Sequence, residues 1–131
     1  MGYRIWAILF GLYIWVQATL TIRFGTDLIF KPDDLGYMAI VFAVTGIAVY
    51  GAGIFFYRLF SLNPFDRATA GILICAVGLL ADMPVAIHYK DVFPDMTPEQ
   101  FSWFVAWVIW GYGVGILTGI WPKNLPGLPK E

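Results

Sequence analysis

The segment Gly71–His88, GILICAVGLLADMPVAIH, decides how the chain is interpreted. It is apolar enough to cross a membrane, yet it contains Asp82, Pro84 and the chain's single histidine. A bilayer core of about 30 Å requires roughly 20 residues of helix. The uncharged part of this region, Ala68–Ala81, is only 14 residues long. The segment therefore spans a membrane only if the helix continues through Asp82 to His88.

The rest of the chain contains three further uncharged runs, Ile5–Ile22, Leu35–Tyr57 and Phe101–Trp121, of 18, 23 and 21 residues. The chain is 60% hydrophobic and 13% charged, which is far from the composition of a soluble domain. We therefore predict a single all-α domain, 1–131, that is an integral membrane protein with a four-helix antiparallel up-and-down transmembrane bundle. The predicted helices are about 3–23, 35–60, 68–88 and 99–121, followed by an extended proline-rich tail, 122–131.

The connections between these helices contain residues that indicate turns and helix starts. Residues 24–30 alternate apolar and polar without the length to span, which predicts a segment lying in the membrane interface. The short turn 61–66 predicts that the second and third helices are antiparallel neighbours. Candidate N-caps precede the later helices, namely Asp33 or Asp34, Asn63 or Asp66, and Thr97 with Gln100 as a capping box.

Positive charge predicts the orientation. With four spans, the two termini and the turn 61–67 share one side, which holds five Lys and Arg residues against three on the other side. An excess of Lys and Arg marks the cytoplasmic side. We therefore expect a multi-pass protein with both termini in the cytoplasm.

Asp82 is the most informative polar residue. It lies six residues before His88, about 9 Å below the outer boundary at a rise of 1.5 Å per residue. A carboxylate at this depth should face the bundle interior and have a partner, and low dielectric favours its protonated form if no cation reaches it. Pro84 predicts a kink, because it leaves the carbonyl of Leu80 without its helical donor. The expected polar layer around the carboxylate contains Gln17, Thr45, Trp107 and Arg23.

The fourth predicted helix carries two stripes. Small residues recur every four positions, which favours close helix packing, and tryptophans recur every three or four. We expect the glycines to pack against the small residues of the second helix, and the tryptophans to meet the bundle, lipid, a flat ligand or a partner. The packing candidates are Gly111, Gly115, Gly119, Gly46 and Gly51, and the aromatic face is Trp103, Trp107 and Trp110.

The sequence gives no support for covalent catalysis, since no nucleophile motif, phosphate-binding glycine loop or Cys-x-x-Cys occurs. His88 with nearby acids is a weak metal candidate, and an interfacial histidine is the simpler interpretation. No cofactor is predicted, although the aromatic content allows a lipid, quinone or pigment. A net charge of −1 argues against nucleic acid as a partner.

Three functional hypotheses remain open. The first, and the leading one from the sequence, is a small accessory or assembly subunit of a larger membrane complex that binds through its glycine and aromatic helix faces. The second is a small homo-oligomeric transporter or channel that uses the intramembrane carboxylate of Asp82. The third is a binder or enzyme for a lipid, quinone or pigment. The expected partners are membrane lipids and other transmembrane subunits or copies of the chain itself.

Overall fold

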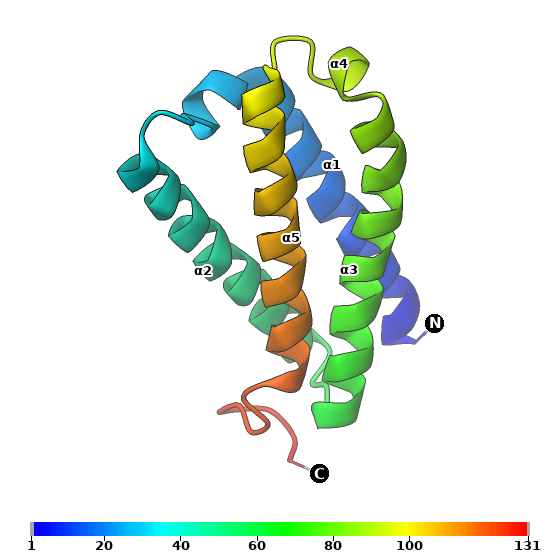
Figure 1. The fold of residues 1–131 in the computed structure, drawn as a ribbon. Coiled ribbons are helices and arrows are strands. Elements are labelled where there is room, and N and C mark those ends of the chain that lie inside the picture. Colours follow the sequence, from blue (N-terminus) through cyan, green and yellow to red (C-terminus); the bar gives the residue numbers. More distant parts are fainter. Residues whose placement is uncertain (1, 131) are drawn as a thin grey trace.

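The computed structural model describes residues 2–130, and this part of the chain forms helices without any strand. Four of the helices are long and apolar enough to cross a membrane, and consecutive ones run in opposite directions (Figure 1). The predicted all-α transmembrane bundle is confirmed. The helices are α1 (Tyr3–Ile29), α2 (Leu35–Leu59), α3 (Pro64–Ile87), the short α4 (Tyr89–Val92) and α5 (Pro98–Ile120).

The helix starts follow the local sequence. The Asp34 side chain accepts the N–H of Tyr37 at the start of α2. Asn63 caps α3, which therefore begins four residues earlier than predicted. At the start of α5, Thr97 and Gln100 form a reciprocal capping box, as predicted.

The end of α1 bears on the prediction for residues 24–30. The helix is assigned to Ile29, but a kink at Gly25 sets its last turn off from the span. Only Gly25 leaves helical geometry, with φ −130° and ψ 23°. Thr26 follows it, buried, and its hydroxyl donates to the carbonyl of Ile22 across the irregular turn. Of residues 24–29 only Thr26 is buried, and Phe24 and Leu28 are exposed.

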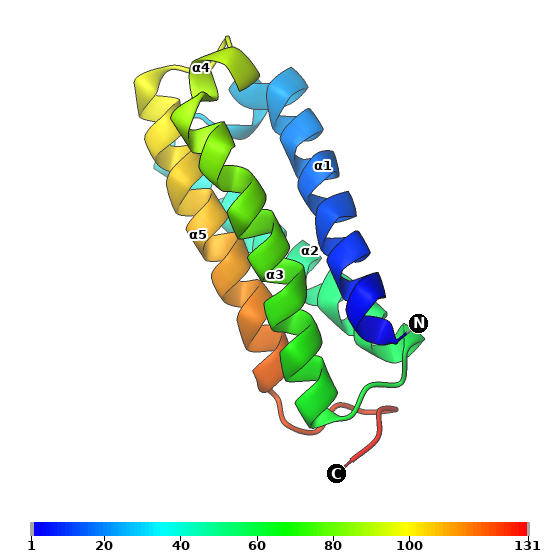
Figure 2. The same cartoon turned by 90° about the vertical axis from the view of Figure 1, so that its right-hand side faces the viewer.

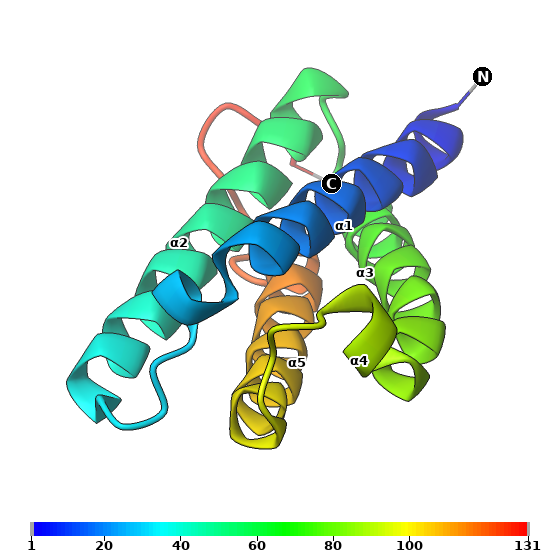
Figure 3. The ribbon, with the colours of Figure 1, turned by 90° about the horizontal axis from the view of Figure 1, so that it is seen from above.

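The spatial order of the helices differs from the chain order. α3 packs along its length against α1 and α5, and α2 packs mainly on α5. Figures 1 and 2 show α3 directly beside α5, and Figure 3 shows α2 and α3 on opposite sides of the bundle. The second and third helices are antiparallel, as predicted, but they are not close neighbours. The turn 61–63 joins two helices that touch little beyond their ends.

Small residues explain why α3 has two close neighbours. A Cβ atom on Gly11 of α1 would lie 2.5 Å from the carbonyl oxygen of Ile74. One on Gly119 of α5 would lie 2.7 Å from the carbonyl oxygen of Arg67, and one on Gly115 would lie 2.6 Å from the sulfur of Cys75. Gly115 and Gly119 of α5 therefore make their closest contacts with α3, whereas the sequence predicted packing against the small residues of α2.

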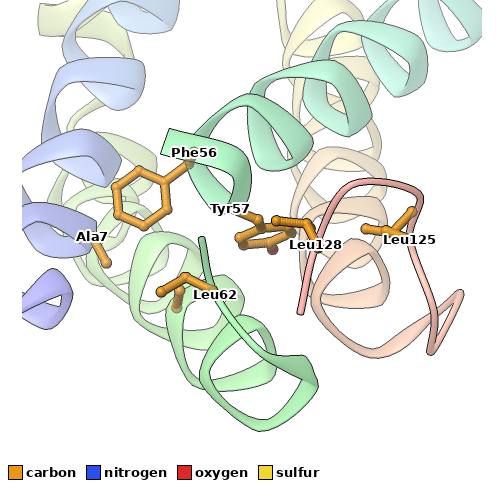
Figure 4. Packing of buried hydrophobic residues seen from close by; sticks show 7 residues of the cluster. Ala7, Phe56, Tyr57, Leu62, Leu125 and Leu128 are labelled. Atoms are coloured by element: carbon orange, nitrogen blue, oxygen red, sulfur yellow. The ribbon is translucent and has the colours of Figure 1, made fainter. Parts of the chain in front are cut away.

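Two buried clusters close the ends of the bundle. The cluster at the end opposite the termini joins the loops to the helices, and consists of Ile22, Phe30, Met38, Val85, Phe93, Met96 and Phe104. The cluster near the termini includes Tyr57 and the tail residues Leu125 and Leu128, which lie against one another in Figure 4. The tail therefore bends and turns back onto the helices, whereas an extended conformation was predicted.

Arg67 of α3 binds this tail through hydrogen bonds. Its side chain is only 1% exposed, and its Nη2 donates to the carbonyl oxygens of Pro122 and Lys123 at 3.0 and 2.6 Å. The Nε and Nη1 atoms are buried without a hydrogen-bond partner among residues 2–130. The guanidinium of Arg67 thus anchors the tail, and its hydrogen-bond acceptors among residues 2–130 are two backbone carbonyls of that tail.

Candidate functional site

A cavity of about 410 Å³ lies inside the bundle, with residues of all four long helices in its wall. Most of the lining atoms are carbon, and Asp82 is the only charged side chain in the wall. Its residues include Trp15 and Gln17 of α1, Thr45 of α2, and Trp107 of α5. A volume of this size is typical of small-molecule sites in proteins.

Asp82 is held by two aromatic donors. The indole N–H of Trp15 donates to Oδ1 at 2.8 Å, and the hydroxyl of Tyr112 donates to Oδ2 at 2.6 Å. The carboxyl group is half-buried, and no Lys or Arg pairs with it in the described residues. One donor on each oxygen fixes the carboxyl plane and leaves lone pairs on both oxygens.

The predicted polar layer is found in part. Gln17, Thr45 and Trp107 do line the same cavity as Asp82. However, the indole N–H of Trp107 donates to the hydroxyl of Thr45 at 2.8 Å, so these two residues satisfy each other. The side chain of Gln17 is exposed. The direct partners of the carboxylate are thus Trp15 and Tyr112, which the sequence prediction missed.

Arg23 corrects another expectation, because it turns away from the cavity. Its Nη1 donates to the carbonyl oxygen of Val92 at 2.6 Å and thereby ties α1 to the end of α4. The end of a helix has unpaired carbonyls and a partial negative charge that attract a guanidinium. Arg23 therefore does not neutralise Asp82.

Two glycines position the donors. A Cβ atom on Gly78, one turn before Asp82, would overlap the hydroxyl of Tyr112. On α1, the contact of Gly11 with the backbone of α3 draws Trp15, one turn further on, toward the carboxylate. The sequence contained a signal for the first pair: Gly78 and Asp82 are four residues apart and share a face of the helix. No local signal selects Trp15 from its aromatic neighbours.

Further polar groups follow the same face of α3 toward the termini. The thiol of Cys75 lies 3.7 Å from the carbonyl oxygen of Tyr112. The hydroxyl of Tyr57 lies 3.1 Å from that of Thr118, and the hydroxyl of Thr118 also donates to the carbonyl of Gly115. All of these residues line the cavity. The wall therefore contains several separate polar side chains, and Asp82 is the only acidic one among them.

The aromatic stripe of α5 faces α2. The indole N–H of Trp110 donates to the carbonyl of Phe42 at 2.9 Å, and Trp103 packs edge-on against the ring of Phe42. Gly46 of α2 makes room for Trp110, since a Cβ atom there would lie 3.2 Å from its ring. Tryptophans therefore join these two helices here, and nearer the termini a Cβ atom on Gly53 of α2 would lie 2.8 Å from the hydroxyl of Thr118. A Cβ atom on Gly51 or Gly111, two of the other predicted packing residues, would meet nothing within 4 Å.

The remaining predicted residues lie outside the cavity. Pro84 lies within α3, which continues to Ile87. His88 is exposed, with Nδ1 3.9 Å from a carboxylate oxygen of Asp91. No third potential ligand joins them, since residues 2–130 contain no group of three metal-binding side chains. The weak metal candidate therefore gains no support.

The fold and the cavity define a class of protein: a small four-span membrane protein with a carboxylate inside an intramembrane cavity. Residues 29–125 match DUF5367, described as a family of unknown function, and the chain belongs to that family. The match includes Asp82 and Tyr112 but not Trp15. No curated protein and no solved structure matches the chain.

Proposed function

We propose that the chain is a small membrane transporter that binds a proton or a cation at Asp82 inside its cavity. The observation that carries this proposal is the placement of a single acidic side chain in a largely apolar cavity lined by all four spans. Ionisable residues within spans are costly and are retained mainly for a function.

The charge balance around Asp82 supports the same conclusion. Trp15 and Tyr112 donate hydrogen bonds but bring no positive charge. An ionised carboxylate in low dielectric is unfavourable unless a positive charge compensates it. A proton or a cation bound in the cavity would supply the positive charge that the described residues do not place beside Asp82.

The proposed orientation puts both termini in the cytoplasm, from the excess of Lys and Arg on that side. Asp82 then lies in the outer half of the membrane. A fluorescent protein fused to the C-terminus reports this orientation, because it is fluorescent only when it folds in the cytoplasm.

Proton flux in proteoliposomes tests the function. The purified chain is reconstituted with a pH-sensitive dye inside the vesicles, and a potassium diffusion potential is imposed. We expect Asp82-dependent acidification, which Asp82→Asn abolishes and Asp33→Asn leaves unchanged. Asp33 is the matched control, because it is an exposed acid near the same end of the bundle. Equal flux through Asp82→Asn and the unchanged chain would exclude a proton role for the cavity.

A second candidate, the accessory subunit, is supported by the exposure of α2. Its buried residues are Met38, Phe56 and Tyr57, and apolar side chains cover most of its remaining surface. Such a surface suits either lipid or a partner's helix. Native mass spectrometry from mild detergent separates these cases. A stable complex with a second polypeptide favours the subunit, and a lone chain or a homo-oligomer favours the transporter.

A further inference from the structure

We infer that the cavity takes a bulky lipophilic organic cation that enters sideways from the bilayer between α1 and α2. This inference rests on the proposed function and names the class of its ligand. Two sets of observations carry it: the chemistry of the cavity wall around Asp82, and the contact between α1 and α2.

The chemistry around Asp82 does not suit a hard divalent metal ion. Hard cations such as Mg²⁺ and Ca²⁺ require six or more oxygen ligands. The neighbours of the carboxylate, Trp15 and Tyr112, direct N–H and O–H groups toward it instead of oxygen lone pairs. The described wall of the cavity contains no second acid that could help to complete a coordination shell.

The same wall suits an organic cation. Apolar side chains form most of the lining, and aromatic rings of Trp15, Trp107 and Phe104 belong to it. Apolar groups gain free energy on leaving water, and the faces of aromatic rings attract a positive charge. The carboxylate then supplies the opposite charge at one side of the cavity. Apolar surface with one buried negative charge is complementary to an ion whose charge is surrounded by hydrocarbon.

The route into the cavity lies between α1 and α2. These helices are joined by a short loop yet touch each other little. Gln17 of α1 and Val44 and Ala48 of α2 line the cavity and are at the same time exposed. Side chains with both properties mark the mouth. Since α1 and α2 are membrane spans, this mouth faces lipid tails, where lipophilic ions concentrate.

Charge selectivity tests the ligand class. The full chain in lipid nanodiscs is titrated with tetraphenylphosphonium and with tetraphenylborate, which have nearly the same shape and opposite charge, and tryptophan fluorescence reports occupancy. We expect saturable binding of the cation only. Asp82→Asn should weaken it about 250-fold, because a charge pair about 5 Å apart at an effective dielectric constant near 20 contributes about that factor. Asp33→Asn should bind as the unchanged chain does.

Two outcomes would overturn the inference. One is equal binding of both ions by the unchanged chain, which needs no variant to fold. The other is unaltered cation binding by Asp82→Asn in a sample that elutes as the unchanged chain does. Asp82→Glu keeps the charge and should retain most of the affinity.

The mouth is tested by kinetics. Ala48→Trp places a large side chain at the opening and should slow cation association at least tenfold. Ile47→Trp is the matched control, because Ile47 is 73% exposed and does not line the cavity. Equal association rates for the two variants would refute entry between α1 and α2.

The inference and the proposed function fail separately. If the phosphonium ion does not bind while Asp82-dependent proton flux persists, the ligand class is wrong and the transporter proposal stands. If neither occurs, both are wrong.

Discussion

The three evenly spaced glycines of α5 should respond very differently to a methyl group. Gly111, Gly115 and Gly119 form one stripe in the sequence, but the structure gives them different surroundings. A Cβ atom on Gly119 would lie 2.7 Å from the carbonyl oxygen of Arg67 and 3.2 Å from the Cα of Ala68. Both are backbone atoms of α3, so relief requires that a helix move. A Cβ atom on Gly111 would meet nothing within 4 Å.

The magnitude follows from comparing Gly119→Ala with Gly111→Ala. Each substitution gains the same helix propensity, about 1 kcal/mol in a helix interior. This term cancels in the difference, and the packing cost at Gly119 remains. Forcing an extra methyl group into a well-packed contact costs about 1–3 kcal/mol. We expect Gly119→Ala to be less stable than Gly111→Ala by about that amount.

Cys75 provides the assay. It is the single cysteine and its side chain is buried, so opening of the bundle on heating should sharply raise its rate of reaction with a fluorogenic maleimide. The glycine that contacts its sulfur is Gly115, so substitutions at Gly111 and Gly119 leave the direct surroundings of the thiol unchanged. Gly113→Ala is a second control on the same helix, since Gly113 is exposed with open space around it. Equal loss of stability in Gly111→Ala and Gly119→Ala would refute the packing of α5 against α3.

Three further predictions concern a cap, the tail and the cavity. Thr97→Ala should cost about 1 kcal/mol of stability in the same heating assay, because α5 loses its N-cap hydrogen bond. Arg67→Gln should loosen the tail, and faster trypsin cleavage after Lys123 measures this; an unchanged rate would contradict the docking role of the guanidinium. Gly78→Ala should destabilise the chain by about 1–3 kcal/mol through overlap with the Tyr112 hydroxyl. Adding Tyr112→Phe should then recover part of that loss, and purely additive effects would argue against the contact.

The spans and their starts could be predicted because they depend on local sequence. Uncharged runs of sufficient length gave four helices, and the capping residues Asp34, Asn63 and Thr97 act within one turn of their own position. The end of α1 was less predictable. The kink at Gly25 comes before Ile29 and Phe30, which pack in a cluster with Phe93 and Met96 from a loop that is distant in the chain.

The neighbours of Asp82 show where sequence reasoning stops. Counting residues from the membrane boundary placed Gln17, Thr45 and Trp107 at a depth similar to that of Asp82, and all three do line its cavity. This count works because depth along a helix depends only on the rise per residue. It could not say which side chains face the carboxylate. That depends on the rotation of each helix and on which helices adjoin, and Trp15 reaches Asp82 because α1 lies against α3.

By itself, the sequence determined that this protein has four membrane-spanning helices, where most of them begin, and that one of them carries an acid within the membrane. Hydrophobic length and capping chemistry are properties of contiguous residues, so they can be read along the chain. Only the tertiary structure decided that α3 lies between α1 and α5, that Trp15 and Tyr112 hold Asp82, and that a cavity surrounds it. Those features depend on the close approach of small residues from different helices, such as Gly11 on Ile74, which no single helix contains.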